Sequence, residues 1–468
     1  MSVRTLEPVI HPGLRCLSEV KEAMAIQIRQ LLNQVSANSA KRALSPFIRI
    51  ELPIAEINIL FWLYNQRAET RIYWSGRDGS FEFGAIGIAD RLKGEGKTDH
   101  KELFDYVNSR LSSKYPRLRY YGGLCFDPLR MSGEWGPFGT YQFVIPKFEI
   151  LRTNGQAIFA FNIAADRVNR EDAENAIIQL NQLDFSSEIS YRKPPKVLKR
   201  LDVPTKEQWN IQFPDILHGI HGKRYDKVVL ARESVFGFDV DIRTCALMKH
   251  LKDKTPNCFH FCFQPERDTA FLGASPERLY KRSQNQLLSE AIAGTRPRGE
   301  DSYHDKQLES QLSHSSKDAY EHKLVVDMVQ EQMRRFCRHV ETDETALKKL
   351  NGSQHLQTSL EGELKSGIRD QEILKALHPT PAVAGTPTET AMDVIRKNES
   401  FARGWYAGPI GYVGYDTSEF AVAIRSGLVH SNQLSLYAGA GIVAGSTSDA
   451  EWDEIENKIG NFIGVFDK

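Results

Sequence analysis

One glutamate lies on the apolar face of a predicted helix, where a charged side chain needs a partner. The segment DAYEHKLVVDMVQEQM covers residues 318–333, and a period of 3.6 residues gathers Leu324, Val325 and Val329 into one apolar arc. Glu321 falls inside that arc rather than opposite it. Because an unpaired carboxylate is costly to bury, Glu321 is expected either to be protonated or to have a partner.

A second helix, predicted over residues 448–466, offers two more carboxylates. Glu451 and Glu454 are three positions apart at the rim of an apolar arc that includes Trp452. Alone, this pattern is typical of a solvated acidic face. Together with Glu321 it suggests carboxylates from two helices around one cation, and oxygen ligands suit Mg²⁺ better than Zn²⁺.

Two residues have the chemistry of a base and an acid. Lys227 opens the apolar strand KVVLA, and burial there would lower the pKa of its ammonium, although a lysine at a strand end can also reach solvent. Glu277, in GASPERL, follows a Ser-Pro turn and is either a surface acid or a general acid. Periodicity alone does not choose between these interpretations.

Three segments carry groups that suit an anionic ligand. Arg425 ends the apolar run AVAIR and presents a planar fork of donors. In YAGAGIVAG (437–445) we expect a turn before a helix, with amides exposed to a carboxylate or phosphate; a dinucleotide site is disfavoured because no βαβ unit surrounds it. His378 lies in the proline-rich loop LHPTPAVAGTP and can donate a hydrogen bond.

The elements that must position these residues are mixed helices and strands. Helices are predicted over 171–183, from Thr205 onward, and over 317–336 and 448–466. Strands are predicted over 47–54, 141–152, 226–234, 258–264, 420–429 and 433–443, with a hairpin over 278–292 and a buried segment at 57–66. Strands that follow one another as hairpins favour an α+β fold with mainly antiparallel sheets.

The CFHFC run places Cys258, His260 and Cys262 on one face of a strand. No second Cys/His cluster completes a tetrahedral metal site, so a buried strand is the preferred interpretation. The basic, proline-containing segment 186–204 is the best boundary, which divides the chain into an N-terminal part, 1–200, and a C-terminal region, 205–468.

Composition excludes several classes of protein. The 468 residues include 60 Lys and Arg against 60 Asp and Glu, so no net charge favours nucleic acid or an anionic membrane. No apolar run is long enough for a transmembrane helix, and the start, MSVRTLEPVIHPGLRC, lacks the apolar core of a signal peptide. Six cysteines in so long a chain fit a reducing cytoplasm better than a disulfide framework.

Residues 205–466 resemble the chorismate-utilising enzymes, a family that includes anthranilate, aminodeoxychorismate, isochorismate and salicylate synthases. The resemblance is carried, in order, by KVVLAR, FLGASPERL, EAIAGTRPRG, KDAYEHKLVVD, LHPTPAVAGTP, GWYAGPIGYV, AIRS and YAGAGIVAGSTSDAEWDE. Residues 1–200 match less sharply but look like the longer N-terminal part of quinone-pathway isochorismate synthases.

The resemblance implies an α/β sandwich with helices outside the sheets and an Mg²⁺-dependent site between them that binds chorismate. Glu321 and Glu454 then look like magnesium ligands, with Glu451 nearby. Lys227 resembles the base that activates water, and Glu277 the acid that protonates the departing hydroxyl. The residues that would contact the substrate are Ala293, Gly294, Thr295, His378, Tyr406, Arg425, Gly439, Ala440 and Gly441.

Details of the motifs favour one branch of the family. Aminodeoxychorismate synthases with a nucleophilic lysine carry it where this chain has Ala293, and the loop HPTPAVAGTP resembles isochorismate synthases. We therefore expect an isochorismate synthase of quinone biosynthesis, with a salicylate synthase as the alternative. An anthranilate-type component would need an amidotransferase partner; we expect a monomer without one. A non-catalytic homologue and an unrelated Mg²⁺ hydrolase are further alternatives.

Overall fold

The computed structural model describes residues 17–37, 45–97, 99–167, 169–186, 195–464 and 466. The segment that was tested for a signal peptide (1–16) and part of the predicted boundary segment (187–194 of 186–204) lie outside the described residues, whereas residues 197–203 of that segment form the strand β7. None of the described helices combines the length and the apolar character needed to cross a lipid bilayer.

The described residues form eleven α-helices and twenty strands. The helices are α1 (Leu17–Ala37), α2 (Ile59–Asn65), α3 (His100–Arg110), α4 (Arg170–Gln182), α5 (Lys206–His221), α6 (Thr244–Lys254), α7 (Ser302–Ser313), α8 (Ser316–Phe336), α9 (Asp370–Leu377), α10 (Thr388–Asn398) and α11 (Ser448–Ile463). The strands of the first half are β1 (Phe47–Ile54), β2 (Arg71–Ser75), β3 (Phe81–Gly94), β4 (Arg119–Leu124), β5 (Tyr141–Thr153), β6 (Gln156–Ala164), β7 (Val197–Val203) and β8 (Lys227–Phe238). Those of the second half are β9 (Phe259–Glu266), β10 (Thr269–Ser275), β11 (Arg278–Ser283), β12 (Gln286–Pro297), β13 (Cys337–Thr342), β14 (Ala346–Lys349), β15 (Ser353–Leu364), β16 (Gly385–Thr386), β17 (Pro409–Gly414), β18 (Thr417–Val422), β19 (Ser426–His430) and β20 (Gln433–Ile442).

Every strand pair in the described part of the chain is antiparallel, and the strands form two connected sheets. One sheet runs β7-β8-β20-β19-β10-β9-β2-β3-β5-β6-β1. The other leaves β5 and runs β4-β17-β18-β11-β12-β15, with β13 and β14 beside β15. Strands from the first 200 residues therefore pair with strands of the C-terminal region.

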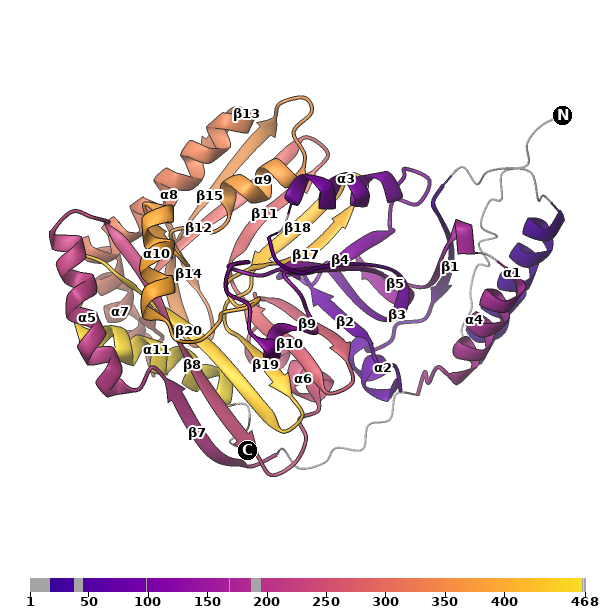
Figure 1. The fold of residues 1–468 in the computed structure, drawn as a ribbon, viewed down its shortest axis with the longest axis horizontal. Coiled ribbons are helices and arrows are strands. Elements are labelled where there is room, and N and C mark those ends of the chain that lie inside the picture. The colour runs from indigo at the N-terminus through magenta and orange to yellow at the C-terminus, as the bar shows by residue number, and fades with distance from the viewer. Residues whose placement is uncertain are drawn as a thin grey trace.

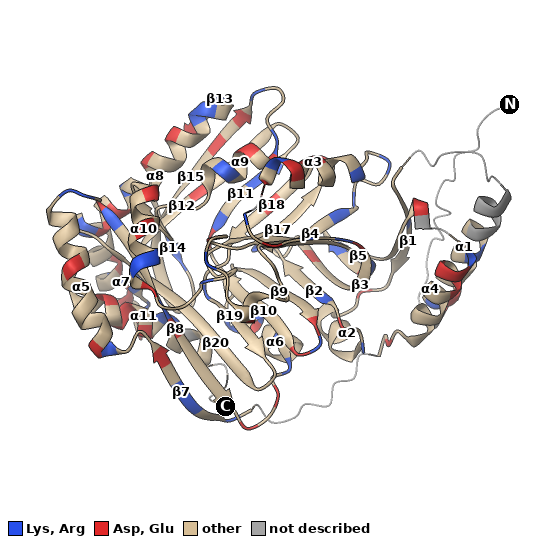
Figure 2. Ribbon diagram, viewed as in Figure 1, with Lys and Arg blue, Asp and Glu red and all other residues tan. Residues whose placement is uncertain are grey.

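Helices lie outside these two sheets, as Figure 1 shows. Helix α8 packs against β12, β13 and β15, whereas α11 packs against β20 and α6 against β9 and β10. Side chains of both charges are spread over the described elements (Figure 2), in agreement with the equal numbers of the two charges. The predicted α+β class, with mainly antiparallel sheets and external helices, is confirmed.

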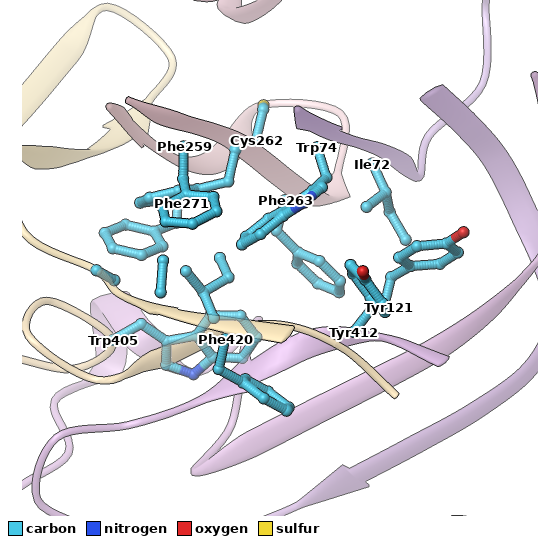
Figure 3. Packing of buried hydrophobic residues seen from close by; sticks show 14 of the residues in the cluster. Ile72, Trp74, Tyr121, Phe259, Cys262, Phe263, Phe271, Trp405, Tyr412 and Phe420 are labelled. Carbon is cyan, nitrogen blue, oxygen red and sulfur yellow. The ribbon is translucent and has the colours of Figure 1, made fainter. Parts of the chain in front are cut away.

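Aromatic side chains fill the space between the two sheets (Figure 3). The Trp405 ring lies 5.3 Å from that of Phe263 and 6.3 Å from that of Phe271, measured between centroids, and Trp74 of β2 meets Tyr412 of β17 edge to face. Burial of such large rings is the main stabilising contribution to a core of this kind.

Most of the elements predicted from the sequence are present, and their local signals explain them. Helix α5 begins with a capping box in which Thr205 and Gln208 satisfy each other's backbone amides. The buried segment at 57–66 contains the helix α2, capped by the Asn58 side chain.

One prediction for the last quarter of the chain was wrong in detail. The strand expected over 420–429 is broken between β18 and β19, where Arg425 adopts a left-handed φ of 50°. The strand expected over 433–443 is β20, which ends at Ile442, and the turn expected within YAGAGIVAG follows it, where Gly445 has a φ of 88° before α11.

Candidate active site

A cavity lies between the two sheets, with about 920 Å³ of free space including the part open to solvent. Its walls come from β8 and β20 of one sheet, β12 and β15 of the other, and the helices α8 and α11. The predicted site residues that line it are Lys227, Glu277, Ala293, Gly294, Thr295, Glu321, Tyr406, Arg425, Gly439, Gly441 and Glu454. Residues from eight separate segments of the sequence therefore meet at one site.

The partner of Glu321 in this structure is Lys227. The lysine is fully buried at the start of β8, and its Nζ lies 2.7 Å from Oε1 of Glu321 on α8. Gly441 leaves room for this ion pair, because a Cβ there would be 2.5 Å from Glu321 Oε1 and 2.7 Å from Lys227 Cε. The glycine is thus required by the close approach of the two side chains.

Glu277 has the properties of a general acid. Its side chain is buried, and desolvation, followed by the nearby charge of Glu290, raises its pKa to about 8 although Lys227 acts in the opposite direction. The carboxyl is therefore protonated at neutral pH and can donate a proton. This raised pKa agrees with the effect of burial expected from the sequence.

The turn that carries Glu277 is held by polar contacts that the sequence did not reveal. Arg77 donates to the carbonyl of Pro276 over 2.9 Å, and Lys348 donates to the same oxygen over 3.1 Å. The Ser275 hydroxyl donates to the carbonyl of Val422 and accepts from the Glu277 amide. Because Arg77 follows β2, the N-terminal part of the chain helps to position the acid.

Arg425 is a cation without an acidic partner. Its Nη2 donates to Ser353 Oγ over 2.9 Å and to His355 Nε2 over 2.8 Å, and no carboxylate among the described residues forms an ion pair with it. Desolvation lowers the pKa of this guanidinium, so a bound anion would stabilise it.

His355 holds Arg425 in place and was missed in the sequence. Since a carbonyl only accepts, His355 Nδ1 donates to Gly294 O over 3.2 Å, which leaves Nε2 to accept from Arg425. Burial and the charge of Arg425 keep the pKa of His355 well below its usual value, so the ring is neutral. In the sequence it is one polar residue in the strand QHLQTSL, without a distinguishing pattern.

A β-bulge aims the residues of EAIAGT at the cavity. The pairing of β12 with β15 shifts between Ala293 and Thr295, and Gly294 at the bulge has a φ of 70°. Tyr406 approaches from another loop, where its ring stacks on that of Tyr437 at 5.4 Å between centroids.

The alternation of β20 decides which of its glycines can bind a ligand. The amides of Val229 and Ala231 on β8 donate to groups other than β20, so the residues opposite them, Gly441 and Gly439, also direct their amides away from β8. Both glycines line the cavity, and Lys458 donates to the carbonyl of Gly439 over 2.8 Å. Ala440 points its amide the other way and does not line the cavity, in contrast to its predicted contact with the substrate.

The three predicted metal ligands are divided between two places. Glu454 lines the cavity and receives Lys458 at 2.7 Å, whereas Glu451 lies outside the lining and receives Lys317 at 2.6 Å. Burial, and then the charge of Glu454, raise the pKa of Glu451, as expected for two neighbouring carboxylates. In the described part of the chain, no three acidic, histidine or cysteine side chains are grouped closely enough to hold a metal as they stand.

Lys317 shows that the three carboxylates nevertheless surround one region. Burial lowers the pKa of its ammonium, but the charges of Glu451, Glu321 and Glu454 together raise it above its usual value. A set of carboxylate oxygens around a cation has the donor chemistry that Mg²⁺ requires.

His378 does not line the cavity. Its Nε2 donates to the carbonyl of Ala407 over 3.0 Å, and burial lowers its pKa to about 4, so the ring is neutral. This contact holds the backbone next to Tyr406, and a direct contact of His378 with substrate stays a prediction.

Comparisons with known proteins agree with this geometry. Residues 30–466 match the model of the chorismate binding enzyme family. Isochorismate synthase 2, chloroplastic, of Arabidopsis thaliana is 36% identical over 89% of this chain and 80% of the relative, and the isochorismate synthase MenF of Bacillus subtilis is 35% identical over 86% and 90%. The solved structure of MenF, the menaquinone-specific isochorismate synthase from Escherichia coli, superposes with a TM-score of 0.83 at 28% identity, covering 95% of this chain and 100% of that one. The chain therefore belongs to the family of chorismate binding enzymes.

Proposed function

We propose that the protein is an isochorismate synthase, which adds water at C2 of chorismate and removes the hydroxyl at C4. The observation that carries the proposal is a cavity that contains a buried lysine, a protonated glutamic acid and an arginine with no acidic partner among the described residues. The relatives that cover most of the chain are named isochorismate synthases, which supports this reaction over others of the family.

Each group has one task in this reaction. Arg425 and the amides of Gly439 and Gly441 bind substrate carboxylate, so the ring is fixed before reaction. Glu277 donates its proton to the C4 hydroxyl as that group leaves, and Lys227 accepts a proton from the attacking water. A base needs a free amine, so the contact between Lys227 and Glu321 is exchanged for contacts with substrate and water in the reacting complex.

We also propose that Mg²⁺ binds at Glu321 and Glu454, with Glu451 nearby. Oxygen ligands suit this ion, and its charge would neutralise the substrate carboxylate beside them. Each of the three glutamates forms an ion pair with a lysine in the structure, so the region around them already accommodates positive charge.

Product identification with purified protein tests the proposed reaction. Incubation with chorismate and Mg²⁺, without an amine donor, is expected to yield isochorismate, and Glu277→Gln serves as the inactive control. Salicylate and pyruvate would instead assign the salicylate synthase branch. Turnover that requires ammonia or an amidotransferase would contradict both assignments and indicate an anthranilate-type component.

The biological setting is proposed from the relatives. Menaquinone-specific MenF is similar along almost the whole chain, so quinone biosynthesis is the favoured pathway. The described cysteines, Cys125, Cys245, Cys258, Cys262 and Cys337, are buried free thiols, which fits the cytoplasm. We propose a monomer that works without an amidotransferase subunit; sedimentation of the purified enzyme measures its mass in solution.

A further inference from the structure

The cavity that holds the proposed active site lies deep between the sheets and is lined by side chains with little exposure to solvent. None of the described residues that line it is exposed; each is buried or half-buried. A substrate the size of chorismate therefore needs a route to it, and the rest of this section rests on the proposed function.

A second cavity of about 960 Å³, including its open part, adjoins the first. The two cavities share three wall residues: Arg425, Lys458 and Phe462. The second one has an exposed rim, formed by the end of α6, the loop after β14 and the end of α11, at residues that include Lys254, Asn351 and Gly460. Its floor is buried, so it leads from the surface to Arg425.

Charge along this cavity suits an anionic substrate. Its described lining residues include the cations Lys254, Lys458 and Arg425 and no carboxylate. Lys254 stands at the rim and Arg425 at the inner end, so the positive potential runs along the length of the cavity. Clefts lined by one sign of charge concentrate ligands of the opposite sign.

The rim is held by few contacts. Lys254 Nζ donates to the carbonyl of Gly464 over 3.0 Å, and the Asn351 side chain donates to the carbonyl of Lys254 over 3.0 Å. These two hydrogen bonds tie three chain segments together at exposed positions, where such bonds are easily exchanged with water. Phe462, at the shared wall, is the apolar side chain between the two cavities.

We propose that this second cavity is the entrance through which the dicarboxylate substrate reaches the active site. The substrate first meets Lys254 at the rim, passes the wall formed by Lys458 and Phe462, and is transferred to Arg425. The entrance contributes to the rate of association and not to the final affinity, because its rim does not contact the bound substrate.

Stopped-flow fluorescence with chorismate tests this route in the full-length Glu277→Gln chain, which binds without turnover. Asn351→Trp, which narrows the rim, is expected to lower the association and dissociation rate constants together, by about tenfold, while the calorimetric Kd stays the same. Lys254→Glu is expected to slow association by about tenfold and to weaken its dependence on salt.

Matched controls are Asn285→Trp, in the turn between β11 and β12, and Lys397→Glu on α10, both exposed and outside both cavities. Unchanged rate constants in Asn351→Trp and Lys254→Glu would overturn the entrance, and so would a weaker Kd with unchanged association. Turnover of chorismate by the unmodified chain is measured first. If it fails, the proposed function is wrong; if it succeeds and the rates do not respond, only the entrance is wrong.

Discussion

At the scale of single residues, the site depends on ionisable side chains that are largely withdrawn from water. Glu277 is protonated because it is desolvated, and Arg425 lacks an acidic partner among the described residues. A desolvated guanidinium without an acidic partner is costly, and a bound substrate carboxylate would offset that cost. Three predictions belong to this scale.

The pH dependence of activity should follow the protonation of Glu277. Only the protonated acid can donate, and its pKa is about 8, so kcat/KM should fall about tenfold per pH unit above that value. Glu277→Gln keeps the size of the side chain without the proton, and it should reduce turnover by ~10²–10⁴-fold while chorismate still binds. Normal turnover in this variant would refute its assignment as the acid.

Arg425→Met should weaken binding of chorismate without preventing folding. The loss of a half-buried cation from a bound carboxylate costs about 2 kcal/mol or more, which is ~30-fold in Kd. Calorimetric titration of the variant measures this change. Arg425→Lys should recover part of the affinity, since it retains the charge but not the fork of donors; equal affinity for all three proteins would remove Arg425 from the binding site.

Glu321→Ala should abolish the Mg²⁺-dependent activity and weaken binding of the ion in the presence of chorismate. The control is Glu331→Ala, which removes an exposed glutamate from the same helix. Both variants are compared by metal titration and by turnover. Unchanged Mg²⁺ dependence in Glu321→Ala would contradict its role as a ligand and leave only its contact with Lys227.

At the scale of elements, irregular positions in the strands aim the reactive groups. The bulge at Gly294 turns EAIAGT toward the cavity, and the break between β18 and β19 lets Arg425 leave its strand. On β20, regular alternation selects Gly439 and Gly441 and excludes Ala440. The positions of bulges and breaks in the strands, and the alternation of residues along each strand, thus decide which residues of a motif reach the substrate.

Gly441→Ala tests this scale. The new methyl group would overlap Glu321 Oε1 and Lys227 Cε, so the ion pair must separate and the base moves from its position. A displacement of this size is expected to lower kcat by ~10²-fold with little loss of thermal stability. Gly133→Ala, which has open space around its Cβ, should be neutral in the same assay.

At the scale of the whole molecule, the space between the sheets serves both stability and function. Aromatic rings fill one part of it, as in Figure 3, and the catalytic cavity occupies another. Strands from the first 200 residues complete both sheets, and Arg77 reaches the turn of Glu277. The N-terminal part is therefore structurally required by the site.

Phe271→Ala should measure what the aromatic core contributes. The ring is fully buried against Trp405 and Trp135, so its loss should reduce the free energy of unfolding by about 3–5 kcal/mol. Chemical denaturation followed by circular dichroism checks this value. Leu129→Ala, at an exposed position, should change it by less than ~0.5 kcal/mol, and similar effects of both changes would show that the core is not packed as described.

The sequence by itself determined part of the secondary structure, the α+β class and the residue types of the site. Periodicity and capping are local properties, so α5, α8, α11 and strands such as β1, β5, β8 and β20 could be read directly, and Glu321 stood out by its helical phase. The partners of these residues could not be read, because pairing across sheets depends on contacts between distant segments. Only the tertiary structure decided that Glu321 meets Lys227, that His355 holds Arg425, and that Ala440 and His378 lie outside the cavity.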